Sequence, residues 1–498
     1  MLEYIIEQTE NYLATKSKSE RKAIGQFFTS KDMAVFMADL FECEKKELLV
    51  LDTGAGTGIL TAAFIEKIST FAVVEKVKVI LYENNADILP LLKANMEYIE
   101  RTAAIEIEYE IKEENYILSN SEKFRNGKKG EVDYIIGNPP YKKIPKDAEE
   151  ALSMPSICYG TPNLYFLFAA MSLFLLKEHG EMVYIIPRSW TSGAYFERFR
   201  KYFLEHCRLT NIHLFVSRDK VFSSEDVLQE TIIIKCVKTQ EQLTTINLSS
   251  SKSNSDFKNA THLDVAYSVV VSEKSKHYVY LPTSQEDIEV LNKVNSFSET
   301  LPELGMKLKT GLTVGFRNRD MLRESYEENS IPLIKAQHFK NGKIQFPAVN
   351  VENQFLVTDK AGMKQKNKHY LLVKRFTAKE ERRRLQPAVY FSEFQPSYEL
   401  ISTDNKINFI ERIDKGELSR EIIAGLYVIF NSTIYDKYYR ILNGSTQVNA
   451  TEINSIRIPS KASLVALGER LIARDVFSTN VCDILLNQLF DEIENVTV

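Results

Sequence analysis

The chain has 498 residues, of which 44% are hydrophobic and 26% are charged. These proportions are typical of an ordinary soluble globular protein, and the length predicts roughly two to three domains. The formal net charge of −4 excludes a polycation, so any surface for nucleic acid must be local. The five cysteines show no zinc spacing, no apolar run could span a bilayer, and the first residues lack the pattern of a signal peptide. We therefore expect a reduced, cytoplasmic protein without a metal site or a membrane segment.

The first segment, residues 1–24, is predicted to be a helical arm that becomes basic towards its end. That end is either solvated or lies along a phosphate backbone. Residues 25–30 then lead into a run whose apolar side chains recur every three or four positions. This spacing predicts one apolar face of a helix, with Thr29 or Ser30 as its N-cap.

The first strand–helix unit carries a glycine-rich turn. Residues 48–51 form a continuous apolar run, as in a parallel strand that is buried on both faces. The run ends in Asp52 and the glycines at positions 54, 56 and 58, and a helix is predicted over residues 59–68. This order favours a nucleotide-like ligand at the helix N-terminus over a plain tight turn. Glu83 follows the next strand, residues 77–82, where it either binds a ribose diol or meets water.

The segment from Val132 to Tyr141 ends a short buried strand in Gly-Asn-Pro-Pro-Tyr. Two successive prolines remove two N–H groups and hold Asn138 in an extended conformation. The resulting row of acceptors suits an exocyclic amino group, and Tyr141 adds a flat face beside it. The simpler interpretation is a turn after a strand.

Seven strands alternate with helices up to about residue 240. They are predicted at residues 48–51, 77–82, 105–111, 134–136, 180–187, 211–215 and 230–235. The alternation predicts an α/β fold with a doubly wound, mostly parallel seven-stranded sheet. Residues 248–260 are rich in serine and asparagine and are typical of a loop or linker. From about residue 300 the chain shows short mixed elements, which predict an α+β domain.

Residues 364–384 hold nine lysine and arginine residues and two glutamates, a local charge of +7. A helix with a basic face is usually just solvated, but so strong a bias in an acidic chain favours a phosphate-contacting surface. The candidate DNA-contacting residues are Lys374, Arg375, Arg382, Arg383 and Arg384.

The order of the glycine turn, the acidic strand end and Asn138-Pro139-Pro140-Tyr141 resembles the gamma (TaqI-like) class of DNA adenine-N6 methyltransferases from restriction–modification systems. Residues 309–315, 331–335 and 443–450 are similar to C-terminal segments of the same group, and residues 374–380 resemble the PstI/BsuBI subgroup. The resemblance implies a class I S-adenosylmethionine-dependent methyltransferase fold. It also implies S-adenosylmethionine as cofactor and a C-terminal target-recognition domain.

The resemblance also implies roles for individual residues. Thr53 and Ser30 stand where the family usually has proline, and Asn115 where it often has aspartate. The implied catalytic residues are Asn138, Pro139, Pro140, Tyr141 and Phe222, with Phe215 as the competing second aromatic. The implied cofactor-binding residues are Phe28, Thr29, Asp52, Gly54, Gly56, Gly58, Glu83, Asn84, Asn115, Tyr116 and Asn138.

The implied domain order is a helical arm at 1–24, a catalytic domain at 25–245, a connecting segment at 246–300 and a recognition domain at 301–498. The implied partners are double-stranded DNA and a cognate restriction endonuclease on a separate chain, and the protein would be a monomer or a dimer. Enzymes that methylate RNA guanine N2 or protein glutamine share Asn-Pro-Pro-Tyr but lack a large C-terminal domain. A DNA-binding module without catalysis is disfavoured by the intact motifs, and no nuclease constellation stands out.

Overall fold

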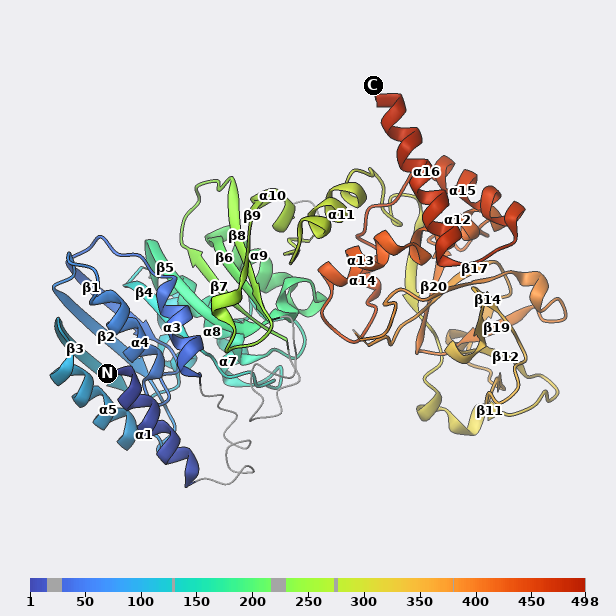
Figure 1. Cartoon of the computed structure of the whole chain (residues 1–498). Coiled ribbons are helices and arrows are strands. Elements are labelled where there is room, and N and C mark those ends of the chain that lie inside the picture. Colours follow the sequence, from blue (N-terminus) through green and yellow to red (C-terminus); the bar gives the residue numbers. More distant parts are fainter. Residues whose placement is uncertain (16–28, 128–129, 216–229, 273–275, 379, 498) are drawn as a thin grey trace. The chain divides into compact units, whose positions relative to one another are not determined.

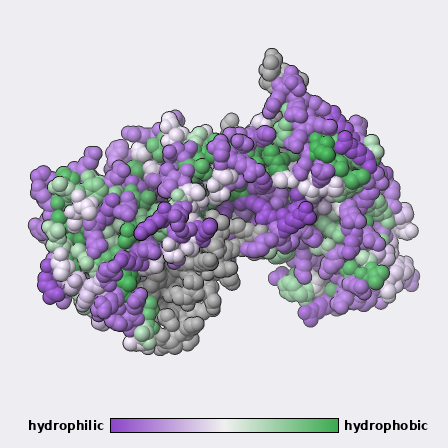
Figure 2. Space-filling model, viewed as in Figure 1, coloured by the Kyte–Doolittle hydropathy of each residue, from purple (hydrophilic) through white to green (hydrophobic). Residues whose placement is uncertain are grey.

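The computed structural model describes residues 1–15, 29–127, 130–215, 230–272, 276–378 and 380–497 (Figure 1). The chain divides into an N-terminal unit, Met1–Gln285, and a C-terminal unit, Glu286–Val498. This boundary lies within the segment that was predicted to connect two domains. No helix of the described residues is long and apolar enough to cross a membrane. The face of the molecule shown in Figure 2 is mostly hydrophilic, with scattered hydrophobic residues.

The N-terminal unit is built on a nine-stranded sheet with the order β3-β2-β1-β4-β5-β7-β6-β8-β9. Strands β1 to β5 are parallel, whereas β7 runs antiparallel to both of its neighbours, β5 and β6. The strands are β1 (Glu47–Asp52), β2 (Lys76–Tyr82), β3 (Glu106–Lys112), β4 (Val132–Gly137), β5 (Leu176–Pro187), β6 (Arg208–Phe215), β7 (Thr231–Val237), β8 (Thr245–Ser251) and β9 (Thr261–Ala266).

Helices cover both faces of this sheet because its central strands are apolar on both sides. Val50 and Ile136 pack in the hydrophobic cluster that also holds residues of α1, α3, α4 and α5. On the other face, Ser172 of α8 bonds Tyr184 of β5, and α8 contacts α6 and α9. The helices are α1 (Leu2–Ala14), α3 (Lys31–Asp39), α4 (Ile59–Ile68), α5 (Leu89–Thr102), α6 (Tyr116–Arg125), α7 (Glu149–Ser153), α8 (Leu164–Leu175), α9 (Glu197–His206) and α10 (Tyr267–Val270).

Two sequence predictions about this unit need correction. The helix predicted at the start of the chain is present as α1, but it is no separate arm, because Leu2 and Ile5 are buried and Thr9 bonds Thr57 at 2.7 Å. The basic end of that predicted arm, residues 16–24, lies outside the described residues. Residues 248–260, predicted as a loop or linker, hold the end of β8, which pairs with β6, and then the loop that leads to β9, which pairs with β8. The predicted seven-stranded sheet is therefore present and is extended by two further strands.

The C-terminal unit is of mixed α+β type, as predicted. It holds a six-stranded sheet, β10-β20-β17-β18-β14-β13, and a five-stranded sheet, β11-β15-β12-β19-β16. The strands are β10 (Met306–Thr310), β11 (Leu322–Arg323), β12 (Ile331–Ile334), β13 (Phe339–Lys340), β14 (Lys343–Ile344), β15 (Phe355–Leu356), β16 (Gln365–Lys366), β17 (Tyr370–Lys374), β18 (Pro387–Tyr390), β19 (Leu400–Thr403) and β20 (Ile407–Arg412).

A closely packed helix pair supports the six-stranded sheet. Helices α12 and α15 cross at two glycines: a Cβ on Gly425 would lie 2.0 Å from the Leu464 carbonyl oxygen, and one on Gly468 would lie 1.8 Å from that of Glu421. Helix α12 also contacts β17 and β18. The helices of this unit are α11 (Gln285–Asn295), α12 (Arg420–Asn431), α13 (Thr433–Leu442), α14 (Ala450–Ile453), α15 (Lys461–Arg474) and α16 (Thr479–Thr497).

Candidate active site

A cavity of about 340 Å³ lies where β1, β2 and β4 of the N-terminal unit end. The carboxyl ends of parallel strands meet at one edge of a sheet, which is where such folds bind ligands. Many residues predicted from separate motifs meet here. The predicted residues that line the cavity are Thr29, Gly54, Gly56, Glu83, Asn84, Asn115, Tyr116, Asn138, Pro139 and Pro140.

The glycine-rich turn between β1 and α4 forms one wall of the cavity. Gly56 and Gly58 have φ values of 55° and 89°, a region that favours glycine. Gly58 caps α4 and does not line the cavity. Asp52 does not line it either, because its side chain is fully buried and accepts a hydrogen bond from the Thr61 hydroxyl at 2.8 Å. These two residues therefore hold the turn and the start of α4 and are not part of the cavity wall.

Glu83 lies at the end of β2 and lines the cavity opposite the glycine turn. Its Oε2 accepts the Gly56 N–H at 3.0 Å, and its Oε1 accepts the Asn85 N–H at 2.7 Å. Burial raises the pKa of this carboxyl, and the surrounding backbone N–H groups oppose that shift. A carboxylate accepts several hydrogen bonds at once, so Glu83 is a suitable acceptor for the hydroxyl groups of a diol.

Another wall of the cavity is formed by Asn115, Tyr116 and Phe168. The Asn115 side-chain oxygen caps α6 by accepting the N–H groups of residues 117 and 118, at 3.1 and 3.2 Å. Its Nδ2 donates to Glu150 Oε1 at 2.9 Å. The Tyr116 and Phe168 rings pack with centroids 5.0 Å apart. The structure thus places Asn115 at the cavity but commits its amide to three other partners.

Asn138 follows β4 at the mouth of the cavity, and its carboxamide is held from both sides. The Tyr141 hydroxyl donates to Asn138 Oδ1 at 2.9 Å and lies 3.0 Å from the Ile185 carbonyl oxygen. Asn138 Nδ2 donates to Thr29 Oγ1 at 3.3 Å. Burial raises the Tyr141 pKa well above its usual value, so the hydroxyl remains a proton donor. These bonds fix the plane of the amide.

Comparison with known proteins places this geometry in a family. A model of the Eco57I restriction–modification methylases matches residues 60–222. The type II methyltransferase M.PstI of Providencia stuartii is 32% identical over 488 residues, which are 95% of this chain and 94% of the relative. This chain belongs to the type II restriction–modification methyltransferases. M.BsuBI of Bacillus subtilis, another type II methyltransferase, is 34% identical over 465 residues, with 92% of this chain and 91% of the relative covered.

The cofactor of this methyltransferase is S-adenosylmethionine, and the cavity fits it. Within the cavity, Gly56 exposes backbone at a left-handed turn, Glu83 offers diol acceptors, and the rings of Tyr116 and Phe168 offer an apolar wall. These are the chemical features that the amino-acid, ribose and adenine parts of the cofactor require.

A chain of hydroxyl groups joins two walls of the methyltransferase cavity from beneath. Tyr184 of β5 is 2.6 Å from Thr53 in the glycine turn and 2.6 Å from Ser172 of α8, which is 2.9 Å from the Tyr116 hydroxyl. The Tyr184 ring also packs under Gly137, where a Cβ would lie 2.6 Å from it. Tyr184 thus supports the cofactor turn, the strand end before Asn138 and the Tyr116 wall.

We expect Tyr184→Phe to raise the KM for S-adenosylmethionine several-fold while kcat changes little. The substitution removes the hydroxyl that bonds Thr53 and leaves another buried hydroxyl without its partner. Leaving a buried polar group without a hydrogen bond costs about 1–3 kcal/mol of stability. Steady-state kinetics with calorimetry of cofactor binding would measure the effect. Tyr202→Phe on α9 is the control, because within the described residues no hydrogen bond of its hydroxyl is seen. A several-fold fall in kcat with an unchanged KM would contradict the positioning role of Tyr184.

The buried Asp52 predicts a pH dependence of stability. Burial raises its pKa to about 7, against opposing hydrogen bonds from Thr61 and Gly54 and with support from the charge of Glu83. The folded state therefore holds a proton that the unfolded state has already lost, and stability falls as pH rises from about 4 to about 7. Asp52→Asn keeps an acceptor for Thr61 and removes this loss, which is at most about 4 kcal/mol. We expect urea unfolding at pH 5 and pH 8 to differ less in the variant; parallel pH profiles would contradict the assignment.

Two of the predicted site residues, Phe28 and Phe222, lie outside the residues that the structure describes. Phe215, the competing aromatic, is buried in the core and packs edge-on against Phe257, so it cannot stack on a base. Residues that sequence reasoning missed, and that line the cavity, are Thr57, Ile59, Leu60, Tyr82, Glu114, Lys142, Glu150, Leu164 and Phe168. They come largely from helices α4, α7 and α8, whose apolar patterns do not distinguish a cavity wall from ordinary core.

Three of the predicted DNA-contacting arginines bond other parts of the protein, and one of them, Arg384, is internal. Arg384 is fully buried, where its guanidinium bonds Thr377, Asn443 and the Ser445 carbonyl oxygen. Arg383 donates to the carbonyl oxygens of residues 385 and 432, and Arg375 to that of residue 405. The prediction of a DNA contact is therefore wrong for Arg384, since a buried side chain that joins segments cannot reach a phosphate. Arg382 is exposed and Lys374 is half-buried.

Proposed function

We propose that this methyltransferase transfers a methyl group to N6 of an adenine in duplex DNA, and that the target base is flipped out of the helix. The observation that carries the proposal is the oriented carboxamide of Asn138 at the mouth of the cofactor cavity, followed by two prolines. When bound, S-adenosylmethionine supplies an electrophilic methyl group on a sulfonium. The C-terminal unit would then serve as the target-recognition domain.

The chemistry assigned to these residues is positioning and charge stabilisation. Adenine N6 is a poor nucleophile because its lone pair is delocalised into the ring. Hydrogen bonds from its two hydrogens to Asn138 Oδ1 and the Pro139 carbonyl oxygen would favour a pyramidal nitrogen and stabilise the positive charge that develops there. The alkylated nitrogen is acidic and loses its proton to water, so no side chain needs a special pKa. Flipping costs a few kcal/mol, which stacking on the Tyr141 ring would help to offset.

Glu150 is assigned a role that the family motif gives to an aspartate at position 115. Because Asn115 uses its oxygen to cap α6, the acceptor at this end of the cavity is the Glu150 carboxylate that Asn115 holds. We expect Glu150→Ala to raise the Kd for S-adenosylmethionine roughly tenfold, as for loss of a hydrogen bond to a charged group. Glu149→Ala is the matched control, because Glu149 is exposed and does not line the cavity. Calorimetry showing equal affinities for both variants would remove Glu150 from the site.

The function is tested by long-read sequencing of DNA from cells that express this chain, scored for N6-methyladenine. One modified adenine in a fixed short sequence would support the proposal and give the target site. Protection of that sequence from a restriction endonuclease on a separate chain would extend it to the biological role. A folded protein that binds S-adenosylmethionine but modifies no adenine would overturn the proposal, and methyl transfer to ribosomal RNA or a release-factor glutamine would replace it.

A further inference from the structure

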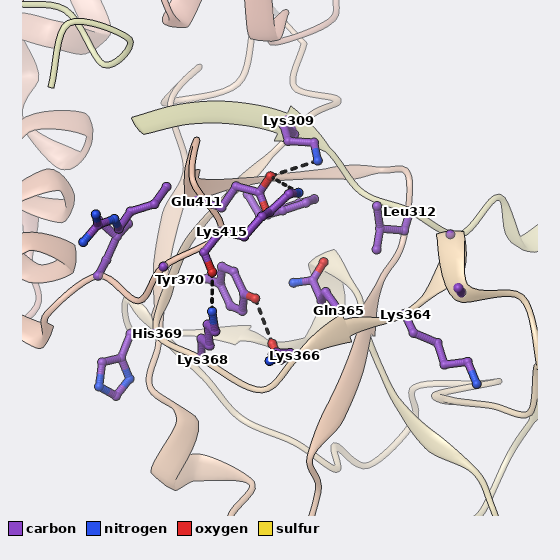
Figure 3. Close-up of a pocket in the computed structure, with 16 residues that line it drawn as sticks. Lys309, Leu312, Lys364, Gln365, Lys366, Lys368, His369, Tyr370, Glu411 and Lys415 are labelled. Atoms are coloured by element: carbon purple, nitrogen blue, oxygen red, sulfur yellow. Dashed lines mark hydrogen bonds and ion pairs between the residues drawn. The ribbon is translucent and has the colours of Figure 1, made fainter. Parts of the chain in front are cut away.

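The C-terminal unit contains a second cavity, of about 440 Å³, that is rich in cationic side chains (Figure 3). Its walls come from β10, from the segment that includes β16 and the start of β17, and from the end of β20 with the loop that follows. One carboxylate, Glu411, lines it. The cationic residues that line it are Lys309, Lys364, Lys366, Lys368, Arg412 and Lys415, so six positive charges and one negative charge leave +5.

Glu411 holds two of the lysines in place at the cavity wall. It accepts a hydrogen bond from Lys309 at 2.9 Å and from Lys415 at 2.8 Å (Figure 3). Burial by itself would raise the Glu411 pKa, but the bonds from the two lysines lower it overall. The carboxylate therefore stays ionised at neutral pH and fixes the two ammonium groups. Lys309 also lies over the Phe409 ring, 5.6 Å from its centroid, so its position is defined on a second side.

The lysines of the central segment supply charge that is not neutralised locally. Lys368 donates to the carbonyl oxygen of Lys415 at 2.5 Å, which ties this segment to the loop after β20. Within the described parts of the chain, neither Lys364 nor Lys366 lies within ion-pair distance of a carboxylate. Three segments far apart in sequence thus contribute cationic residues to the walls of one cavity, with a single acid among them.

We infer that this lysine cavity binds a phosphate group of the DNA backbone. The inference rests on the proposed function and deepens it by locating a contact with the DNA partner. Lysine is a strongly hydrated point charge that suits phosphate without demanding one orientation. Phosphate contacts fix the position of a protein on a duplex and carry no sequence information, which agrees with a site whose charged residues are mostly lysines.

The cavity also divides the basic segment of residues 364–384 into two parts with different roles. The lysines at its start line the hollow, whereas Arg383 and Arg384 at its end bond internal carbonyl and hydroxyl groups. The local charge of +7 in the sequence therefore overstates what is available to a ligand. Lys309 and Lys415 lie outside that segment but add positive charge to the cavity.

The test compares the double variant Lys364→Ala/Lys366→Ala with Lys461→Ala/Arg474→Ala. The control pair removes the same charge from exposed positions of α15 in the same unit. Binding of a fluorescent duplex is measured by anisotropy between about 50 and 200 mM salt, a range over which phosphate contacts change affinity strongly. We expect the cavity variant to bind target and unrelated duplexes more weakly and to lose up to about 2 from the slope of log K against log salt, since each contact contributes about 0.9.

An unchanged salt slope in the cavity variant, or an equal change in the control pair, would overturn the inference and leave the proposed function intact. If millimolar inorganic phosphate binds the wild-type cavity but leaves DNA binding unchanged, the cavity takes free anions and not the DNA backbone. Wild-type protein that binds S-adenosylmethionine but no duplex would refute both the proposed function and this inference. Cofactor affinity, measured on all variants, is expected to stay at the wild-type value because it belongs to the other unit.

Discussion

Asn138→Ala is expected to slow methyl transfer by at least about 100- to 1,000-fold, the effect of removing a preorganised group that stabilises developing charge. The side chain offers the oxygen that one N6 hydrogen needs, and its plane is set by Tyr141 and Thr29. Single-turnover transfer to a duplex that contains the target would measure the loss. Affinity for DNA and for S-adenosylmethionine is expected to remain near the wild-type value, since few binding contacts are removed.

Tyr141→Phe is the informative partner of that variant. It keeps the aromatic face and the Asn138 carboxamide but removes the hydroxyl that donates to Asn138 Oδ1. We expect a rate between those of the wild type and Asn138→Ala, because the amide loses one of the bonds that fix its plane. A loss of specific DNA binding in Asn138→Ala would contradict the role assigned to this side chain.

Gly468→Ala is expected to destabilise the C-terminal unit by about 3 kcal/mol, the upper range for inserting a methyl group into a packed contact. A Cβ at this position would lie 1.8 Å from the Glu421 carbonyl oxygen, so α12 and α15 would have to separate. The added Cβ would clash with backbone atoms of α12, so no change of side-chain rotamer relieves the clash. Urea unfolding followed by tryptic cleavage within residues 286–498 would report on this unit.

Gly362→Ala is the matched control, because nothing lies within 4 Å of the added Cβ. It is the same chemical change in the same unit and is expected to be nearly neutral. Binding of S-adenosylmethionine should survive in both variants, since the cavity belongs to the N-terminal unit. Equal stability of Gly468→Ala and Gly362→Ala would show that the helix pair has room to adjust.

The elements that sequence reasoning predicted best are those whose signal is local. The apolar run of β1, the glycine turn and the acid at the end of β2 are consecutive, so one strand–helix unit specifies them. Strands β8 and β9 were missed because the serines of β8 and of the loop after it look like a linker. In the structure Ser249 and Ser251 are buried on β8 and bond the ring of His213 on β6, at 2.8 and 3.0 Å. Polar residues in a buried strand are recognisable only once their partner strand is known.

The same distinction applies within the site. Glu83 and Asn138 line the cavity as predicted, because strand ends position them directly. Phe168 was missed, since on an entirely apolar helix nothing separates a cavity wall from core. Asp52 and Arg384 were expected to meet ligands but are buried, because a charged side chain in a motif or a basic cluster has the same sequence signal whether it binds a ligand or the fold itself.

The outer edge of the large sheet has a consequence for how the protein behaves in concentrated solution. Strand β3 ends the sheet and directs the exposed carboxylates of Glu106, Glu108 and Glu110 to one face of its free edge. A second copy that paired there would bring like charges opposite one another, which disfavours strand addition. Two of these carboxylates share Lys76, and the third, Glu110, lies 3.6 Å from Lys112, so an incoming strand would meet a row of charged side chains. The open edge of the sheet is thus guarded against the edge-to-edge stacking that leads to aggregation.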